Sequence, residues 1–250
     1  MRLPRIITDF RDLSDTTEEM AALARLVEDA AHEMGFQYIA VLHSTSLMRG
    51  SARLIRYDNY PTGWERRLIG RGHNVIDPIL SIARRRVAGF LWSDALARAN
   101  LSDAQNAILE AGARYGMREG FTVPANVPGE PEGSISFASR STRRIGRERQ
   151  LIMDSIGRIA FETARRIIGF STATPQRPQL GDRVRECIYW IAQGKTDQDI
   201  ADILGIGLET VRTYVKSAFR AFNVITRAQL VYQALAFGLL DFTPSIPPSG

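Results

Sequence analysis

The sequence is poor in cysteine and in long apolar runs. It contains one cysteine, Cys187, which excludes an internal disulfide framework and fits a reducing compartment. No apolar run approaches the ~18 residues that are needed to span a bilayer. The first ten residues also lack the continuous apolar stretch of a signal peptide. These absences predict a cytoplasmic protein without a membrane segment.

Patterns typical of catalysis or metal binding are lacking as well. His32, His43 and His73 have no metal-ligand spacing and no neighbouring cluster of cysteine or carboxylate side chains. No Ser/His/Asp arrangement is visible. The GKT run at residues 194–196 resembles the end of a P-loop, but Tyr189 occupies the position of that motif's first glycine. We therefore expect no enzyme, no metal site and no cofactor.

What is present suits two globular domains. The chain has 250 residues, of which 44% are hydrophobic and 24% are charged. Its formal net charge of +5 permits binding to nucleic acid. From residue 177 onward, however, eight basic side chains stand beside seven acidic ones. DNA binding by this part of the chain would therefore depend on where its charges lie.

Residues 1–170 alternate helical and strand-like patterns. The predicted helices are residues 16–34, 62–70, 78–86, 101–115 and 146–168. The predicted strands are residues 37–43, 52–58, 121–126 and 134–139. Asp15 or Thr16 would cap the first helix, Asp77 the helix that begins at Pro78, and Ser102 the fourth. This order is typical of an α+β fold with an antiparallel sheet packed between helices.

The rest of the chain is predicted to be all helical. The run STATPQRP (residues 171–178) is polar and interrupted by proline, as in a linker between domains 1–170 and 179–241. Helices are expected over residues 183–193, 197–204, 208–222 and 227–237, with a disordered tail over 242–250. The second and third of these helices are joined by only three residues, which indicates a helix-turn-helix unit in a four-helix domain.

The second helix of this unit carries two kinds of surface. Leu208, Val211, Val215 and Phe219 form one apolar stripe. The polar residues that face elsewhere are Thr210, Arg212, Thr213, Lys216 and Arg220. Arginine and lysine can donate to guanine in the major groove, and hydroxyls suit phosphates. A solvated charged face would show the same periodicity, so the pattern alone leaves both interpretations open.

The preceding helix of the unit begins next to Lys195 and Thr196. Free backbone N–H groups and a lysine at a helix start are suited to a phosphate. We therefore include both residues among the candidate DNA contacts.

Longer motifs resemble a known family. The run WIAQGKTDQDIADILGIGLETVRTYVKSAFRAFNV (residues 190–224) resembles the DNA-binding domain of the LuxR family. The runs NYPTGW (59–64), IDP (76–78), FLWS (90–93) and GMREGFTVP (116–124) resemble, in residues and spacing, the acyl-homoserine-lactone-binding domain of LuxR/TraR-type quorum-sensing regulators. The resemblance implies an N-terminal α-β-α sandwich that encloses one N-acyl-homoserine lactone.

The resemblance also assigns roles to single residues. Trp64 would donate to the lactone carbonyl, and Asp77 would accept from the ligand's amide N–H. Trp92 would pack on the lactone ring, while Tyr60 and Ser139 would donate to the acyl carbonyl. The residue types agree, since tryptophan only donates and a carboxylate only accepts. Without the resemblance, the tryptophans could equally be core residues and Asp77 only a helix cap.

Two further positions follow from the same resemblance. Leu68 stands where the family usually has an aromatic residue beside the acyl chain, which predicts a different or roomier acyl site. Arg212 and Lys216 fall where the family contacts bases.

The predicted function is a quorum-sensing transcription factor. It would bind a palindromic promoter element as a homodimer and act with RNA polymerase. Three alternatives remain open from the sequence. The regulator could answer a non-lactone signal or none, it could be a dimerising antagonist that does not bind DNA, or it could hydrolyse lactones, although no activated nucleophile is visible.

Overall fold

The computed structural model describes residues 3–43, 54–64, 77–127, 130–170 and 178–240. The chain divides into two compact units. Unit 1 comprises residues 1–127 and 131–172, and unit 2 comprises residues 128–130 and 173–250. The described residues do not include positions 171–177 of the linker predicted over 171–178, the predicted tail, most of the helix predicted over 62–70, or Leu68.

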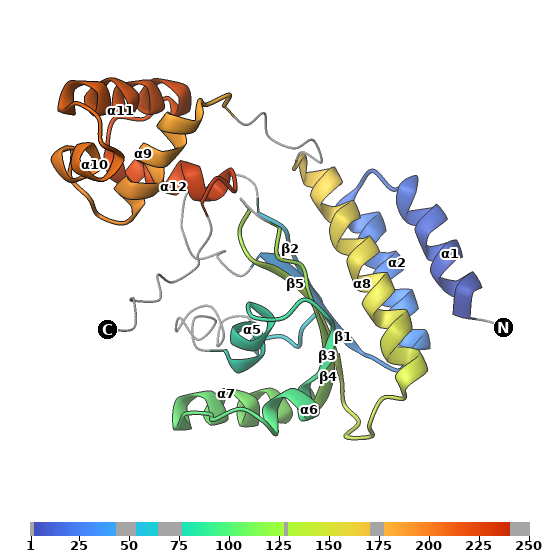
Figure 1. Cartoon of the computed structure of the whole chain (residues 1–250). Coiled ribbons are helices and arrows are strands. Elements are labelled where there is room, and N and C mark those ends of the chain that lie inside the picture. Colours follow the sequence, from blue (N-terminus) through green and yellow to red (C-terminus); the bar gives the residue numbers. More distant parts are fainter. Residues whose placement is uncertain (1–2, 44–53, 65–76, 128–129, 171–177, 241–250) are drawn as a thin grey trace. The chain divides into compact units, whose positions relative to one another are not determined.

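Unit 1 is built on a five-stranded antiparallel sheet (Figure 1). The strands are β1 (Tyr38–His43), β2 (Arg56–Asp58), β3 (Phe90–Leu91), β4 (Glu119–Pro124) and β5 (Gly133–Ser139). Their order across the sheet is β2-β1-β5-β4-β3, so the two long C-terminal strands lie at its centre. In the register of the central pair, Thr122 stands opposite Ser136.

Helices cover both faces of this sheet. On one face, α2 (Met20–Glu33) and α8 (Arg147–Ile168) pack on the strands, and α1 (Leu3–Asp15) packs on these two helices. The other face carries α5 (Pro78–Ala83), α6 (Trp92–Leu96) and α7 (Asp103–Arg114), as Figure 1 shows. The expected α+β fold with an α-β-α sandwich is confirmed.

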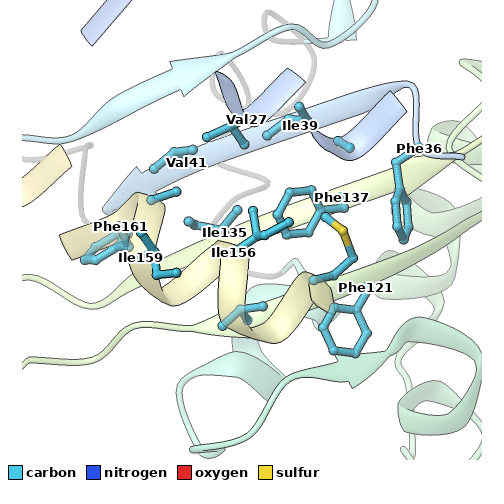
Figure 2. Close-up of a cluster of buried hydrophobic side chains, with 14 of the residues drawn as sticks. Val27, Phe36, Ile39, Val41, Phe121, Ile135, Phe137, Ile156, Ile159 and Phe161 are labelled. Atoms are coloured by element: carbon cyan, nitrogen blue, oxygen red, sulfur yellow. The ribbon is translucent and has the colours of Figure 1, made fainter. Parts of the chain in front are cut away.

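Alternation along the strands explains why the two faces differ. Successive strand residues point to opposite faces, and the larger apolar ones point toward α2 and α8. There, Ile39, Ile135 and Phe137 are buried against Ile156 and Phe161 of α8 (Figure 2). The residues between them in sequence are smaller, such as Ser136, which leaves room on the opposite face.

The N-terminus differs from the prediction. An additional helix that was not predicted, α1, precedes α2, and α2 begins at Met20 rather than at residue 16. The Thr16 hydroxyl donates to the Leu13 carbonyl at 3.1 Å, so it lies at the end of α1. Neither Asp15 nor Thr16 caps α2, and that expectation was wrong.

Two expected helix caps are confirmed. The Asp77 carboxylate accepts from the backbone N–H groups of Ile79 and Leu80, at the start of α5. Ser102 forms a reciprocal capping box with Gln105 at the start of α7. The strand predicted over 52–58 is shorter, since β2 begins at Arg56, and β3 and α6 were not predicted.

Unit 2 consists, over its described residues 178–240, of four helices. These are α9 (Asp182–Ala192), α10 (Asp197–Leu204), α11 (Leu208–Phe222) and α12 (Arg227–Ala236). The predicted all-helical arrangement is confirmed, and α10 and α11 have the predicted bounds. Gly205 ends α10 with a φ of +64°, in the left-handed region that favours glycine. Ile206 then packs against the buried cluster of the unit.

Candidate functional site

The face of the sheet opposite the large core encloses a cavity of about 380 Å³. Most of its wall is apolar and comes from β1, α5, α6 and α7, with Leu42, Leu80, Leu96 and Ile108 among the lining residues. This volume suits a small organic molecule. Four residues singled out in the sequence meet here, although they are far apart along the chain: Tyr60, Trp64, Asp77 and Trp92.

Asp77 serves both the fold and the cavity. Its Oδ1 accepts from the backbone N–H of Ile79 at 2.8 Å and of Leu80 at 3.3 Å, which caps α5. Within the described part of the chain, no group bonds to its Oδ2. Burial raises the pKa of this carboxyl to about 6, and the two backbone N–H groups and Arg84 offset part of that rise. One carboxylate oxygen therefore remains for a donor in the cavity.

Tyr60 supplies a hydroxyl donor. Burial raises the pKa of its phenol well above the usual range, and the carboxylates of Asp77 and Asp58 add to the effect. The phenol therefore stays protonated and can donate to a carbonyl oxygen. Tyr60 follows Asn59, whose side chain accepts from the backbone N–H of Ile39 at 2.7 Å and donates to Glu28 at 2.9 Å. These bonds fix the residue before Tyr60 to β1 and α2.

Trp64 is buried in a satellite cluster with Ile108 and Met117. Its ring lies 5.6 Å from that of Tyr115, and the end of its indole packs on Gly112 of α7. Among the described residues, none bonds to its indole N–H. Trp64 thus combines an apolar wall with a donor that is available to a bound molecule.

Trp92 is arranged differently. Its indole N–H donates to the Thr122 hydroxyl at 2.9 Å, and this hydroxyl lies 2.9 Å from that of Ser136. The indole packs directly on Gly120, where an added Cβ would lie 2.4 Å from Trp92 Cε2. Because its N–H is already bonded, Trp92 offers the cavity its ring surface.

Ser139, another predicted ligand contact, is not among the residues that line this cavity. Ser139 lies three residues beyond Ser136 on β5, and an odd separation along a strand places a side chain on the opposite face. Its hydroxyl accepts from the backbone N–H of Ser141 at 3.1 Å, outside the cavity. Ser136 lines the cavity instead. The sixth predicted ligand contact, Leu68, lies outside the described residues.

The second candidate site is the surface of α11. Val211 and Val215 are buried in the core of unit 2, and Leu208 and Phe219 pack partly buried against it. The predicted DNA-binding residues of this helix are all exposed: Thr210, Arg212, Thr213, Lys216 and Arg220. Arg212 is ion-paired with Glu209 one turn earlier, and Thr213 donates to the Glu209 carbonyl at 2.9 Å. The helix thus presents a basic ridge opposite its buried stripe.

The start of α10 is bonded to Arg227, the first residue of α12. Lys195 and Thr196, the other predicted DNA contacts, are exposed. The Thr196 hydroxyl accepts from the backbone N–H of Asp199 at 3.2 Å, while Asp199 accepts from the Thr196 backbone N–H at 2.8 Å. Arg227 donates to the Lys195 carbonyl at 2.8 Å and pairs with Asp197. These bonds fix the backbone of the turn that carries Lys195.

Two family models match the chain, one in each half. A model described as "Autoinducer binding domain" matches residues 19–164, more than half of the chain. A model described as "Bacterial regulatory proteins, luxR family" matches residues 178–234. The chain belongs to the LuxR family. The expected resemblance to autoinducer-binding LuxR-type transcriptional regulators is confirmed.

Individual LuxR-family proteins are similar over most of their length. SdiA of Escherichia coli (strain K12) is 29% identical over 219 residues, covering 86% of this chain and 88% of its own. AhyR of Aeromonas hydrophila, described as a transcriptional activator, is 28% identical over 225 residues, covering 87% and 85%. A structure of SdiA in complex with octanoyl-rac-glycerol has a TM-score of 0.59 at 25% identity and covers 95% of this chain and 94% of that one.

The residues singled out from the LuxR-type motifs include Tyr60, Trp64, Asp77 and Trp92 of the cavity but not Ser136, another polar residue that lines it. Thr122 and Ser136 lie opposite each other on β4 and β5, and both side chains are buried. The sequence did contain a signal for Ser136, since Ser134, Ser136 and Ala138 alternate with the large apolar residues of β5.

None of the helices in the described residues is long and apolar enough to cross a membrane.

Proposed function

We propose that this protein is a cytoplasmic quorum-sensing regulator that binds an N-acyl-homoserine lactone in the cavity of unit 1. As a homodimer, it would bind a palindromic promoter element through α11 of each protomer and act with RNA polymerase. The observation that carries the proposal is the convergence of Tyr60, Trp64, Asp77 and Trp92 on one apolar cavity.

Each polar group of such a ligand has a matching partner in the cavity. The Trp64 indole N–H suits the lactone carbonyl, and Asp77 Oδ2 suits the amide N–H, because the first group only donates and the second only accepts. The Trp92 ring would pack on the lactone. Tyr60 and Ser136 would donate to the acyl carbonyl, and Leu68 would border the acyl chain.

Hydrogen-bond direction supports the role of Ser136. Trp92 can only donate, so the Thr122 hydroxyl accepts from it. The Thr122 proton can then go to Ser136, 2.9 Å away. This leaves the Ser136 proton for a carbonyl oxygen in the cavity.

The exposed ridge of α11 supports the DNA-binding half of the proposal. Arg212 and Lys216 can donate to guanine, while Thr210, Thr213 and Arg220 suit neighbouring phosphates. The N-terminus of α10, with Lys195 and Thr196, suits a further phosphate. Because two recognition helices of a dimer read two half-sites, the operator is expected to have two-fold symmetry.

Thermal unfolding of the purified protein against a panel of acyl-homoserine lactones tests the ligand. A cognate lactone at ~1000 times its Kd should stabilise unit 1 by roughly 4 kcal/mol. Asp77→Ala and Ser136→Ala should reduce the shift in melting temperature. Ser139→Ala is the matched control, because it removes a hydroxyl from the other face of the same strand. Equal loss in both serine variants would argue against the proposed contact.

A second candidate ligand comes from the solved relative. SdiA is described in complex with octanoyl-rac-glycerol, which is an acyl compound without a lactone. The panel should therefore include this compound. Stabilisation by it and by no lactone would replace the lactone with another acyl signal, whereas stabilisation by neither would reject an acyl ligand.

The DNA-binding proposal needs its own readout. Sites selected in vitro by the full-length protein from random duplexes should be palindromic. Arg212→Ala combined with Lys216→Ala should abolish this selection. Failure of the wild-type protein to select any site would favour the antagonist alternative.

A further inference from the structure

The positive charge of unit 1 is concentrated in one short segment. Residues 1–176 contain 24 basic and 20 acidic side chains. Residues 140–149 alone contain five arginines and one glutamate, so the rest of that region carries 19 side chains of each sign. The remainder of the chain, which includes the proposed DNA-binding helix, is nearly neutral, with eight basic and seven acidic side chains.

This segment forms the wall of a surface cleft. It connects β5 to α8, and its residues border a hollow together with Met34, Gly35 and Phe36 at the end of α2. Four of the five arginines line this basic cleft, namely Arg143, Arg144, Arg147 and Arg149, and Arg140 lies next to it at the end of β5. All five are exposed. Arg149 reaches across the cleft to within 3.8 Å of the Cβ position of Gly35.

Two of the five arginines have partners in the protein. Arg144 pairs with Asp94 at 2.9 Å, and Arg140 donates to the Tyr38 hydroxyl at 2.9 and 2.7 Å. Among the described residues, no acidic side chain lies within ion-pair distance of Arg143, Arg147 or Arg149. Three guanidinium groups therefore remain available at one surface.

We infer that the basic cleft binds the phosphate backbone of the same DNA molecule that α11 recognises. This inference rests on the DNA-binding half of the proposed function. Guanidinium groups pair with phosphates in a planar, two-point geometry. Sequence-independent affinity for DNA comes from such contacts, and the arginines of the cleft would add to those that unit 2 supplies. Covalent connection to unit 2 raises the effective concentration of the cleft near bound DNA.

The salt dependence of DNA binding tests the inference. The probes are a duplex with an in-vitro-selected site and the same site with long flanks. Because α8 alone spans about 33 Å from the cleft to its last residue, each flank should exceed roughly 10 base pairs. The full-length variant Arg143→Ala/Arg147→Ala/Arg149→Ala is compared with Arg5→Ala/Arg11→Ala/Arg114→Ala, which removes the same charge from other exposed positions of unit 1.

On the flanked duplex, the cleft variant should lower the slope of log Kobs against log salt by about 2 to 3, since each phosphate contact contributes about 0.9. The control variant should keep the wild-type slope. A wild-type slope in the cleft variant on both duplexes would overturn the inference. Loss of binding to anionic vesicles in the cleft variant, with the DNA slopes unchanged, would overturn it too and assign the cleft to a membrane.

A separate arm isolates failure of the proposed function. Arg212→Ala/Lys216→Ala should lose preference for the selected site but keep the contribution of the cleft on long random-sequence duplex. If the wild-type protein selects no site, the slope difference on random duplex still tests the cleft.

Discussion

The two units of this protein encode their structure at different distances along the chain. In unit 2, the turn between α10 and α11 is set by neighbours in sequence: Thr196 and Asp199 cap α10, and Gly205 ends it. In unit 1, the cavity depends on partners such as Trp92 and Thr122, which lie thirty residues apart. Local signals therefore determine where α10 ends and α11 begins, whereas strand pairing determines the cavity of unit 1.

The largest effect on stability is expected from a substitution that creates a cavity in the core of unit 1. Phe137 is fully buried between the sheet and α8. Phe137→Ala should destabilise unit 1 by about 3–5 kcal/mol, through lost burial and an unfilled space. Calorimetry should show the transition of unit 1 moving down while that of unit 2 stays. Leu151→Ala, at an exposed apolar position of α8, is the control. A joint shift of both transitions would contradict the independence of the two units.

A smaller effect is expected from an added methyl group in the cavity wall. At Gly120, a Cβ would meet three atoms of the Trp92 indole at 2.4–2.7 Å. Gly120→Ala should therefore displace Trp92, cost about 1–3 kcal/mol by overpacking, and weaken ligand binding. Gly146→Ala is matched to it, because nothing lies within 4 Å of the added Cβ there. Titration of ligand against tryptophan fluorescence compares the two variants. Equal affinities would mean that the position of Trp92 does not matter.

Part of the cavity and of the fold of unit 1 could be predicted from the sequence. The motifs identified Tyr60, Trp64, Asp77 and Trp92, and the caps identified the starts of α5 and α7, because these signals are contained in short runs of sequence. Ser136 was missed in favour of Ser139 because strand register decides which serine faces the cavity, and a shift by an odd number of residues reverses the face. β3 was not predicted for the same reason: it consists of two residues and is defined only by its pairing with β4, which lies far away in sequence.

One carboxyl group in each unit has a shifted pKa, and the two shifts have opposite directions. Burial raises the pKa of Asp77 from 3.8 to about 6, whereas backbone and hydroxyl donors of Thr196 lower the pKa of Asp199. Folding therefore favours protonated Asp77, so the empty unit 1 gains stability as the pH falls from about 6 toward 4. Asp199 favours its ionised form, so the cap of α10 loses stability as the pH falls below its ordinary pKa.

Ligand affinity should follow the ionised form of Asp77, because the carboxylate must accept the ligand's N–H. The affinity should be constant above about pH 7 and about tenfold lower at pH 5, where roughly ten of eleven empty molecules carry the proton. Asp77→Asn should bind more weakly at pH 7 and show a flat profile. Fluorescence titrations across this range measure both. A flat wild-type profile would remove Asp77 from the ligand contacts.

The smallest predicted effect concerns unit 2 and tests whether its structure is as local as its sequence suggests. Thr196→Ala removes the side chain that caps α10 and should cost about 1 kcal/mol. Thr210→Ala, on the exposed face of α11, has no hydrogen bond to lose among the described residues and should change stability by less than about 0.5 kcal/mol.

If Thr196 also contacts phosphate, loss of its side chain should weaken DNA binding by more than the loss of the cap accounts for. Asp199→Ala separates the two roles, because it disrupts the same capping box but leaves the Thr196 hydroxyl in place. Equal DNA affinities of the Thr196 and Asp199 variants would assign Thr196 to the fold of α10 alone, and would leave Lys195 as the phosphate contact of that turn.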